Sequence, residues 1–322
     1  MPMPVSMGAL FMFWLFIAIG LVLLTVGAEA LIRGATSIAR RFGLSELLIG
    51  VTLVGFGTSS PELVSSLGAA LAGSPGVAVG NVVGSNIANI LLILGVAALI
   101  APVPVASEGF RRDAPALIAA TLMAIGVSMT GEYGRIAGGV FLFALVAYIV
   151  VAYVTEKRAA EAHLLDVPHE EPRPLLPSLI FAAAGLALLA GGAKLLVSGA
   201  IGIATSLNVS ETLIGLTIVA IGTSLPELVT SVVASLRGKS DLAFGNVIGS
   251  NIYNTLGILG ATALVHPVAA PFAIIRFDNW IMAAATAALV LFAATRNRIE
   301  RWEGALLVAG YAAYIAFLAV NA

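Results

Sequence analysis

Long apolar runs separated by short polar connections make up most of this chain. A helix that crosses the hydrocarbon core of a bilayer needs about 20 mostly apolar residues. Ten segments meet this requirement, near residues 8–32, 44–71, 77–100, 115–130, 135–154, 177–203, 211–236, 242–265, 279–295 and 304–320. The pattern therefore predicts an all-α integral membrane protein with ten transmembrane helices.

One long hydrophilic connection interrupts these segments. It reads EKRAAEAHLLDVPHEEPRP, residues 156–174, and is charged and contains proline. It separates one group of five helices within residues 1–155 from a second group within residues 176–322. We expect residues 156–175 to form a linker loop between two five-helix halves.

The distribution of Lys and Arg predicts the orientation of the chain. Twelve of these residues lie in connections on the side of the 156–174 loop, and two, Arg135 and Arg276, lie in connections on the other side. Cytoplasmic loops collect Lys and Arg. We therefore expect a multi-pass protein of the cell membrane, with this loop in the cytoplasm and both termini outside. Because each half has an odd number of helices, the two halves should have opposite orientations.

A sequence repeat relates the two halves. Residues 50–95 align with residues 215–260 without a gap, and 27 of the 46 positions are identical. Internal similarity at this level indicates duplication, and opposite orientation would make the copies inverted repeats, as in transporters whose substrate site lies near the bilayer midplane. A repeat kept only for packing would preserve size and apolarity. The strictest identities here are instead Thr, Ser, Pro, Glu and Asn.

The composition excludes several other classes of protein. Only 10% of the residues are charged, with a mean hydropathy of +1.05, whereas a soluble domain carries about 25% charged residues. The net charge of −1 gives no reason to expect a nucleic-acid partner. The absence of Cys excludes disulfides and thiolate metal sites, and three scattered His are too few for a histidine metal site. No Lys or Arg precedes Arg33, so we expect no cleavable signal peptide.

The repeated motifs GTSSPEL and GTSLPEL place a carboxylate, Glu62 or Glu227, inside a membrane helix. A charge at the centre of such a helix costs roughly 2.5–3.5 kcal/mol on insertion scales. The two acids could be structural, either protonated or ion-paired with Arg33 and Lys194. They could also be ligands of a shared cation, and we favour this second hypothesis because one cation neutralises both acids.

A proline precedes each carboxylate. Pro61 has no N–H to bond the carbonyl of Gly57, and its ring displaces that carbonyl; Pro226 does the same to Gly222. Transporters use the unwound carbonyls of broken helices to coordinate cations, and such carbonyls are tolerated at membrane depth only beside a cavity or another partner. A plain kink is the simpler alternative. Hydroxyls before the proline and a carboxylate after it, in both copies, favour a broken helix lined by ligands.

The next helix of each half carries a polar stripe, because residues four positions apart share a helix face. The stripe consists of Asn81, Ser85 and Asn89 in GNVVGSNIAN and of Asn246, Ser250 and Asn254 in GNVIGSNIYN. The first asparagine of each stripe is either a ligand or a partner of the opened backbone. Asn86 and Asn251 lie off the stripe, and we expect them to bond between helices. Small residues allow helices to approach closely, and those beside the stripe are Gly80, Gly84, Gly245 and Gly249.

All the donor atoms in these motifs are oxygen. They comprise two carboxylates, loosened carbonyls, the amides of Asn89 and Asn254, and the hydroxyls of Thr58, Ser59, Ser85, Thr223, Ser224 and Ser250. Ca²⁺ takes about 6–8 oxygen ligands, and these motifs contain no imidazole or thiolate to select zinc or copper. Two carboxylates match the charge of Ca²⁺, and hydroxyl and carbonyl ligands suit Na⁺. The residues therefore predict a site for Ca²⁺ and Na⁺.

These motifs resemble the alpha-repeats of the sodium/calcium exchanger family, within the calcium/cation antiporter superfamily. The ten-helix layout extends the resemblance over nearly the whole chain, which is similar to the short prokaryotic members because its 156–174 loop is too short for calcium-sensing domains. The resemblance implies two inverted five-helix repeats, with helices two and seven broken and alpha-repeats over 44–100 and 209–265. The first and sixth helices would slide across the other eight to alternate access.

The resemblance also implies roles for individual residues. Ca²⁺ would be held by Glu62 and Glu227, assisted by Thr58 and Thr223. Na⁺ would share this centre and occupy flanking sites formed by Ser59, Ser85, Ser224, Ser250 and the carbonyls of Gly55 and Ala220. Asn89 and Asn254 would lie at the middle of the site. We expect no resident cofactor and no obligatory protein partner; the partners would be the two transported ions and the lipid bilayer.

One departure from the family pattern concerns coupling. Many relatives carry Asp where this chain has Asn254, and in the potassium-dependent branch that acid is associated with the K⁺ requirement. Asn at both 89 and 254 favours a potassium-independent exchange of Na⁺ for Ca²⁺. It also weakens the alternative of proton coupling, in which the same scaffold would exchange Ca²⁺ for H⁺.

Two other classes fit the motifs less well. Paired ligands on broken helices could line a channel, but a channel needs weak, multi-ion sites and no closed intermediate. An intramembrane enzyme would lack a Cys nucleophile, a buried His pair and a base beside Ser59 or Ser224. We therefore expect a secondary active antiporter rather than an enzyme.

Overall fold

The computed structural model describes residues 7–105, 107–163, 174–207 and 220–321, and nearly all of them are helical. The helices of the first half are α1 (Met7–Phe42), α2 (Glu46–Ile49), α3 (Gly55–Thr58), α4 (Ser60–Leu71), α5 (Pro75–Ala88), α6 (Gly95–Ile100), α7 (Ser107–Ser128) and α8 (Arg135–His163). Two π-helical segments continue these helices, η1 (Gly50–Val54) between α2 and α3 and η2 (Asn89–Leu94) between α5 and α6.

The second half has a matching order of elements. Its helices and π-helical segments are α9 (Leu175–Ser206), α11 (Ala220–Thr223), α12 (Leu225–Leu236), α13 (Ser240–Ile252), η4 (Tyr253–Leu259), α14 (Gly260–Val265), η5 (Ile274–Asp278), α15 (Asn279–Arg296) and α16 (Arg301–Asn321). Two short antiparallel pairs join the halves. They are β1 (Val103–Pro104) with β4 (Arg298–Ile299) and β2 (Glu132–Tyr133) with β3 (Val268–Ala269).

Among the described residues, six helices are long and apolar enough to cross a membrane, and a bent pair, Glu46–Thr58 with Ser60–Leu71, makes a possible seventh. The predicted segments agree with the helices within a few residues, with three main differences. Helix α1 continues to Phe42, beyond the predicted end at residue 32. Helix α7 begins at Ser107, earlier than predicted. Helix α8 continues to His163, so the first part of the predicted linker loop is helical. Residues 164–173 of that loop and 211–219 of the seventh predicted segment lie outside the described residues.

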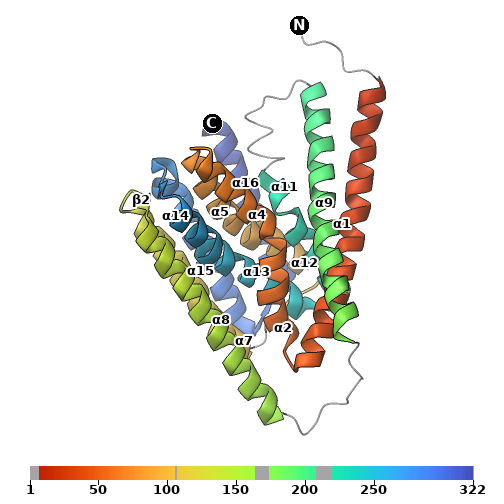
Figure 1. The fold of residues 1–322 in the computed structure, drawn as a ribbon, viewed down its shortest axis with the longest axis vertical. Helices are drawn as coiled ribbons and strands as arrows, with labels where there is room; N and C mark the ends of the chain where they lie inside the picture. The colour runs from red at the N-terminus through yellow and green to blue at the C-terminus, as the bar shows by residue number, and fades with distance from the viewer. Residues whose placement is uncertain (1–6, 106, 164–173, 208–219, 322) are drawn as a thin grey trace.

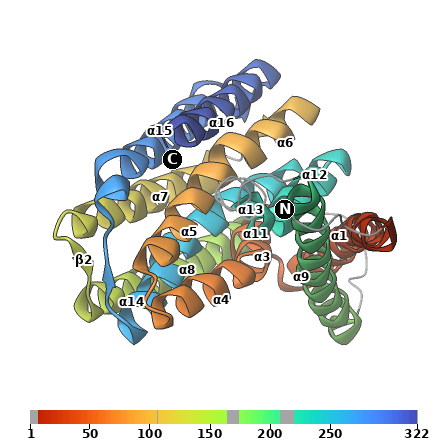
Figure 2. The same ribbon diagram turned by 90° about the horizontal axis from the view of Figure 1, so that it is seen from above.

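Helices α1 and α9 pack against each other along their length at one side of the molecule (Figures 1 and 2). Small residues allow this close approach. A Cβ atom added to Gly20 would lie 2.8 Å from the carbonyl oxygen of Gly192, and one added to Gly185 would lie 2.5 Å from the backbone nitrogen of Leu31. The remaining helices form a larger body, whose core includes Ile87, Leu94 and Phe244.

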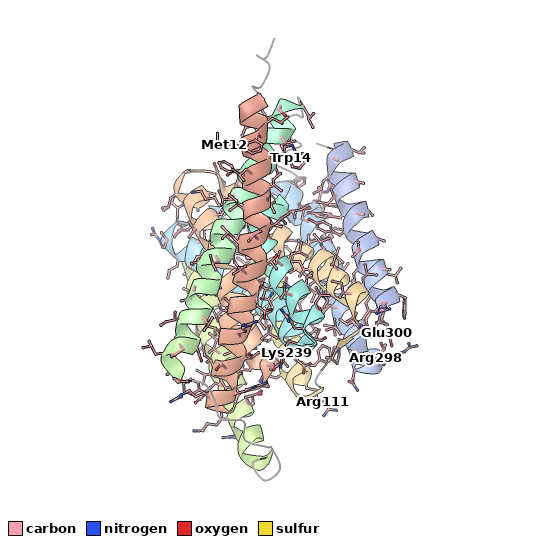
Figure 3. The ribbon with its side chains drawn as sticks, turned by 90° about the vertical axis from the view of Figure 1, so that its right-hand side faces the viewer. Met12, Trp14, Arg111, Lys239, Arg298 and Glu300 are labelled. Atoms are coloured by element: carbon pink, nitrogen blue, oxygen red, sulfur yellow. The ribbon has the colours of Figure 1, made fainter. Side chains whose placement is uncertain are left out.

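The molecule has two ends that differ in charge. We call the end where α1 begins and α16 ends, which also carries the β2–β3 pair, the terminal face, and the end where α1 and α8 stop the linker face (Figure 1). Arg111, Lys239 and Arg298 lie toward the linker face, whereas Met12 and Trp14 lie toward the terminal face (Figure 3). Three of the basic residues that predicted the orientation therefore lie toward the same end of the fold.

Candidate functional site

Two breaks in the helices form the framework of the site. Ser59 has φ −82° and ψ 6° and separates α3 from α4, while Ser224 has φ −89° and ψ 9° and separates α11 from α12. The bend at the first break is 43°. Pro61 and Pro226 lie in the first turn of the helix that follows, where a missing N–H costs no helical hydrogen bond. The break therefore falls two residues after the glycine at which the sequence predicted the helix to open.

Each serine at a break bonds the carboxylate of the other copy. The hydroxyl of Ser59 donates to Oε1 of Glu227 at 2.8 Å, and the hydroxyl of Ser224 donates to Oε1 of Glu62 at 3.3 Å. Both carboxylates are only 1% exposed. The structure thus brings the two predicted acids together at one buried centre.

Several polar atoms at this centre have no hydrogen-bond partner among the described residues. They are Oε2 of Glu62, Oε2 of Glu227, and the side-chain oxygen and nitrogen of Asn89 and of Asn254. Buried polar groups are normally bonded, and exceptions in a native protein need a cause such as a function or an ion. An unpartnered oxygen on each of two buried carboxylates makes this centre the candidate functional site.

The ion-pair alternative for the two glutamates is not observed in the described part of the chain. Arg33 bonds Glu29 at 2.8 Å on its own helix, as an i,i+4 pair, and Glu29 also accepts a bond from Arg237 at 3.0 Å. Lys194 is exposed and lines a cavity beside the breaks. The two buried carboxylates therefore have no basic partner among the described side chains.

The polar stripes of α5 and α13 flank the carboxylates. Ser85 accepts a hydrogen bond from Ser224 at 3.3 Å, and Ser250 donates to the carbonyl oxygen of Gly55 at 3.2 Å. Asn89 and Asn254 are fully buried. Both asparagines lie where an α-helix changes to a π-helix, at the start of η2 and within η4. Such segments are frequent at functional sites, and no local signal in the sequence predicted them.

The first asparagine of each stripe bonds the backbone of the broken helix. Asn81 Nδ2 donates to the carbonyl oxygen of Glu62 at 3.2 Å and to the hydroxyl of Ser66 at 2.9 Å. Asn246 Nδ2 bonds the carbonyl of Glu227 at 3.3 Å and the hydroxyl of Ser231 at 2.9 Å. Of the two roles left open by the sequence, the structure supports positioning. Each asparagine holds the backbone that carries a glutamate.

The off-stripe asparagines differ from each other. Asn86 donates to Thr255 Oγ1 at 2.8 Å, so the predicted bond between helices is confirmed. Asn251 instead donates to the carbonyl of Val247 in its own helix at 2.8 Å, so the prediction was wrong there. The carbonyl of Val247 lies one turn away, which makes it the nearest acceptor for an asparagine inside a helix.

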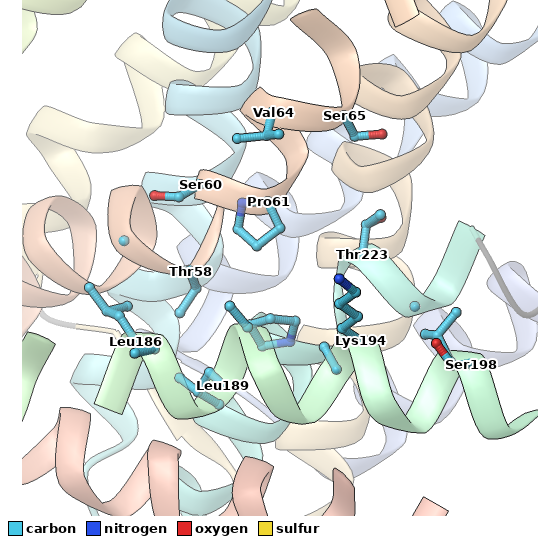
Figure 4. A pocket seen from close by; sticks show the side chains of 17 residues that line it. Thr58, Ser60, Pro61, Val64, Ser65, Leu186, Leu189, Lys194, Ser198 and Thr223 are labelled. Carbon is cyan, nitrogen blue, oxygen red and sulfur yellow. The ribbon is translucent and has the colours of Figure 1, made fainter. Parts of the chain in front are cut away.

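The threonines before the breaks also differ. Thr58 is buried and donates to Oδ1 of Asn246 at 3.2 Å and to the carbonyl of Gly55 at 3.4 Å. Thr223 is partly exposed and lines a cavity of about 700 Å³ between α4, α9 and α11, where Lys194 points toward it (Figure 4). Ala220 begins α11.

The chemistry of the site is that of oxygen ligands only. The described residues contain no group of three or more His, Cys, Asp or Glu side chains that could hold a metal ion. A bound cation would therefore depend on two carboxylates together with hydroxyl, amide and carbonyl oxygens, which suit Na⁺ and Ca²⁺ rather than transition metals. Two buried carboxylates among oxygen donors, within helices long enough to cross a membrane, are typical of ion-transport proteins.

The comparison with known proteins gives the family. The model of the family described as sodium/calcium exchanger protein matches residues 12–154 and again residues 177–320. This chain belongs to that family of membrane antiporters.

Relatives and solved structures agree over nearly the whole chain. The protein CaxA of Alkalimonas amylolytica is 40% identical over 93% of this chain and 96% of its own length. The sodium/calcium exchanger MaX1 of Methanosarcina acetivorans is 33% identical over 95% of this chain and 98% of its own. The structure of the sodium-calcium exchanger NCX_Mj soaked with zero Na⁺ and Ca²⁺ is 32% identical, covers 96% of this chain and 99% of its own, and superimposes with a TM-score of 0.84.

Proposed function

We propose that this protein is a secondary active antiporter that exchanges Na⁺ for Ca²⁺ across the cell membrane by alternating access. The observation that carries the proposal is the buried pair Glu62 and Glu227, each bonded by the serine of the opposite copy and each with one oxygen that lacks a partner among the described residues. The relatives MaX1 and NCX_Mj, which are named as sodium/calcium exchangers, support the choice of ions.

We further propose ten transmembrane helices in two inverted halves, residues 1–155 and 176–322, joined by the cytoplasmic linker 156–175. The two broken helices would be the second and the seventh. The terminal face would be extracellular, because cytoplasmic connections collect basic residues and Arg111, Lys239 and Arg298 lie toward the linker face.

In this proposal the ligands divide between the two ions. Glu62 and Glu227 would hold Ca²⁺, assisted by oxygen atoms of Thr58 and Thr223. The flanking Na⁺ ligands would be Ser59, Ser85, Ser224, Ser250 and the carbonyls of Gly55 and Ala220, with Asn89 and Asn254 at the middle. The burial of seven of the eight serine, threonine and asparagine side chains in this set, all but Thr223, supports a common centre.

Charge explains why such a site would exchange ions rather than leak them. Without a cation, the ionised site would hold two buried negative charges, and enclosing uncompensated charge in a dry, closed state is costly. A bound Ca²⁺, or Na⁺ in its place, would compensate that charge and allow the site to change sides. The empty protein would therefore return slowly, and transport of one ion would require the other.

The moving part would be the pair of helices α1 and α9, which pack on each other and lie at one side of the larger body (Figure 2). The cavity beside Thr58 and Thr223 is bounded by α9 on one side and by the two breaks on the other. A shift of α9 along this boundary would change access to the hydroxyls of the site without separating the two carboxylates.

Reconstitution into proteoliposomes tests the proposal. An outwardly directed Na⁺ gradient should drive ⁴⁵Ca²⁺ uptake that saturates, and addition of K⁺ should leave the rate unchanged. Uptake driven by a pH gradient in the absence of Na⁺ would assign the Ca²⁺/H⁺ alternative. Flux that does not saturate and requires no counter-ion would indicate a channel instead.

A further inference from the structure

The 165-residue offset between the copies also relates a second pair of acids, Asp113 in α7 and Asp278 at the end of η5. Both accept a hydrogen bond from a tyrosine on the last helix of their own half. Tyr148 donates to Oδ1 of Asp113 at 3.0 Å, and Tyr314 donates to Oδ1 of Asp278 at 2.9 Å. The two acids therefore occupy equivalent places in the two halves.

Asp113 and Asp278 differ in whether a basic residue compensates the charge of the carboxylate. Arg112 binds Asp113 with two nitrogens, Nε to Oδ1 at 2.6 Å and Nη2 to Oδ2 at 2.9 Å, and Asp113 is fully buried. Such a bidentate pair compensates the carboxylate. The position that corresponds to Arg112 is Phe277 in the second copy. The second copy therefore lacks the basic residue that neutralises the acid of the first.

Asp278 has no ion pair among the described residues, and Oδ2 of its carboxylate has no hydrogen-bond donor there. The neighbouring Arg276 is exposed, and its guanidinium lies over the ring of Phe272, 5.4 Å from the ring centroid. One carboxylate oxygen is therefore available to a ligand.

The side chain of Asp278 lines a cavity of about 450 Å³ between α5, α11, η5 and α16. The same cavity is lined by Ser85 and Asn81 of the polar stripe and by Thr223 beside the second break. Asp278 is the only carboxylate among its described lining residues. The cavity thus connects an uncompensated acid with hydroxyls of the buried site.

Asp278 follows closely after β3, which lies at the terminal face. We propose that Asp278 is a capture site for a hard cation near this face, from which the ion passes to Ser85 and the two glutamates. A single carboxylate supplies one negative charge, which matches Na⁺, whereas Ca²⁺ requires more oxygen ligands. A cleft lined by one sign of charge raises the local concentration of the opposite ion. Asp113, neutralised by Arg112, has no such role. This inference rests on the proposed exchange activity.

The sidedness of Na⁺ activation tests the capture site. Na⁺-dependent ⁴⁵Ca²⁺ flux is measured in right-side-out and everted vesicles for wild type, Asp278→Asn, Asp278→Glu and the control Glu132→Gln, which removes an exposed acid from the same face. We expect Asp278→Asn to raise the half-saturating Na⁺ concentration about tenfold at the terminal face only. Asp278→Glu should restore it, and Glu132→Gln should leave it unchanged.

A structural role would give a different result, because it would alter activation from both faces or lower the yield of monodisperse protein in both Asp278 variants. Either of these outcomes, or unchanged Na⁺ activation in Asp278→Asn, would overturn the capture site while wild-type exchange still supports the proposed function. Absence of Na⁺-dependent flux in the wild type would instead reject the proposed function itself.

Discussion

The two copies of the repeat carry the same residues at the site but have different surroundings. In the second copy, α13 packs tightly on the first broken helix: a Cβ atom added to Gly249 would lie 2.1 Å from the carbonyl oxygen of Val51, and Asn246 is fully buried. In the first copy, Asn81 is partly exposed and lines a cavity.

Under the proposed mechanism, this difference between the surroundings of the two copies reflects the conformational state of the protein. Asn81 and Asn246 are equivalent in the sequence repeat but differ in exposure, and under this mechanism the difference would come from the state of the molecule rather than from its chemistry. Inverted repeats that alternate access would exchange these environments when the site opens to the other side. Variants placed at matched positions in the two copies therefore probe the state, and variants at the carboxylates probe the chemistry.

The largest effect on transport is expected from changes to Glu62 and Glu227, the carboxylates that both copies share. Glu62→Gln and Glu227→Gln should each reduce Na⁺-driven ⁴⁵Ca²⁺ uptake in proteoliposomes to the level of protein-free vesicles, because either change removes one of the two negative charges that a divalent cation requires. Glu132→Gln, an exposed acid at the terminal face, serves as the control and should transport normally. Normal uptake by either site variant would refute the proposed ligand set.

The next effect concerns the packing of α13 on the first broken helix. Gly249→Ala would force a backbone shift of α13 or η1, since a methyl group cannot occupy the space held by the Val51 carbonyl. Overpacking of this kind costs about 1–3 kcal/mol or more, so Tm in detergent should fall by roughly 5 °C or more. A Tm equal to that of the wild type would contradict this close packing.

A smaller difference, in Ca²⁺ affinity, is expected between variants of Asn81 and Asn246, the asparagines that hold the broken helices. Asn246 makes bonds to Thr58, Glu227 and Ser231, whereas Asn81 bonds only Glu62 and Ser66 among the described residues. Changes to residues that orient metal ligands typically lower affinity about 10–100-fold. Asn246→Ala should therefore weaken Ca²⁺ binding more than Asn81→Ala, as measured by calorimetric titration. The reverse order would show that burial of these asparagines does not govern their contribution.

The smallest effect that we expect concerns the coupling of transport to K⁺ or to H⁺. Asn254→Asp introduces a third acid into the buried centre and should make transport depend on K⁺ or on pH, with a modest change in the maximal rate. Asn89→Asp is the matched change in the other copy and distinguishes an effect of this position from that of added charge alone. An unchanged K⁺ and pH profile in Asn254→Asp would remove the basis for the expected K⁺ independence.

Local signals predicted much of the fold and the chemistry of the site. Apolar length predicted the helices, and the combination of Pro61 with a following carboxylate predicted a break, which lies two residues from the expected opening. Spacing of four predicted that Asn81 and Ser85 share one face. These features depend on residues within one or two helical turns of each other, and a sequence records them directly.

Features that depend on distant partners were not predicted. The π-helical turns at Asn89 and Asn254 have no local signature, because they depend on packing against other helices. The bond of Asn251 to the carbonyl of Val247 in its own helix was also not predicted. The contrast between Asp113 and Asp278 required knowledge of which tyrosine and which cavity each acid faces.

Equilibrium binding of ⁴⁵Ca²⁺ to the purified protein in Na⁺-free detergent tests most directly whether the two halves share one ion. We predict that the wild type binds one Ca²⁺ between Glu62 and Glu227 and that Glu62→Gln and Glu227→Gln each abolish that binding. If either single variant still bound Ca²⁺ with wild-type affinity, the acids would belong to independent sites, and a cation shared between the two halves would be ruled out.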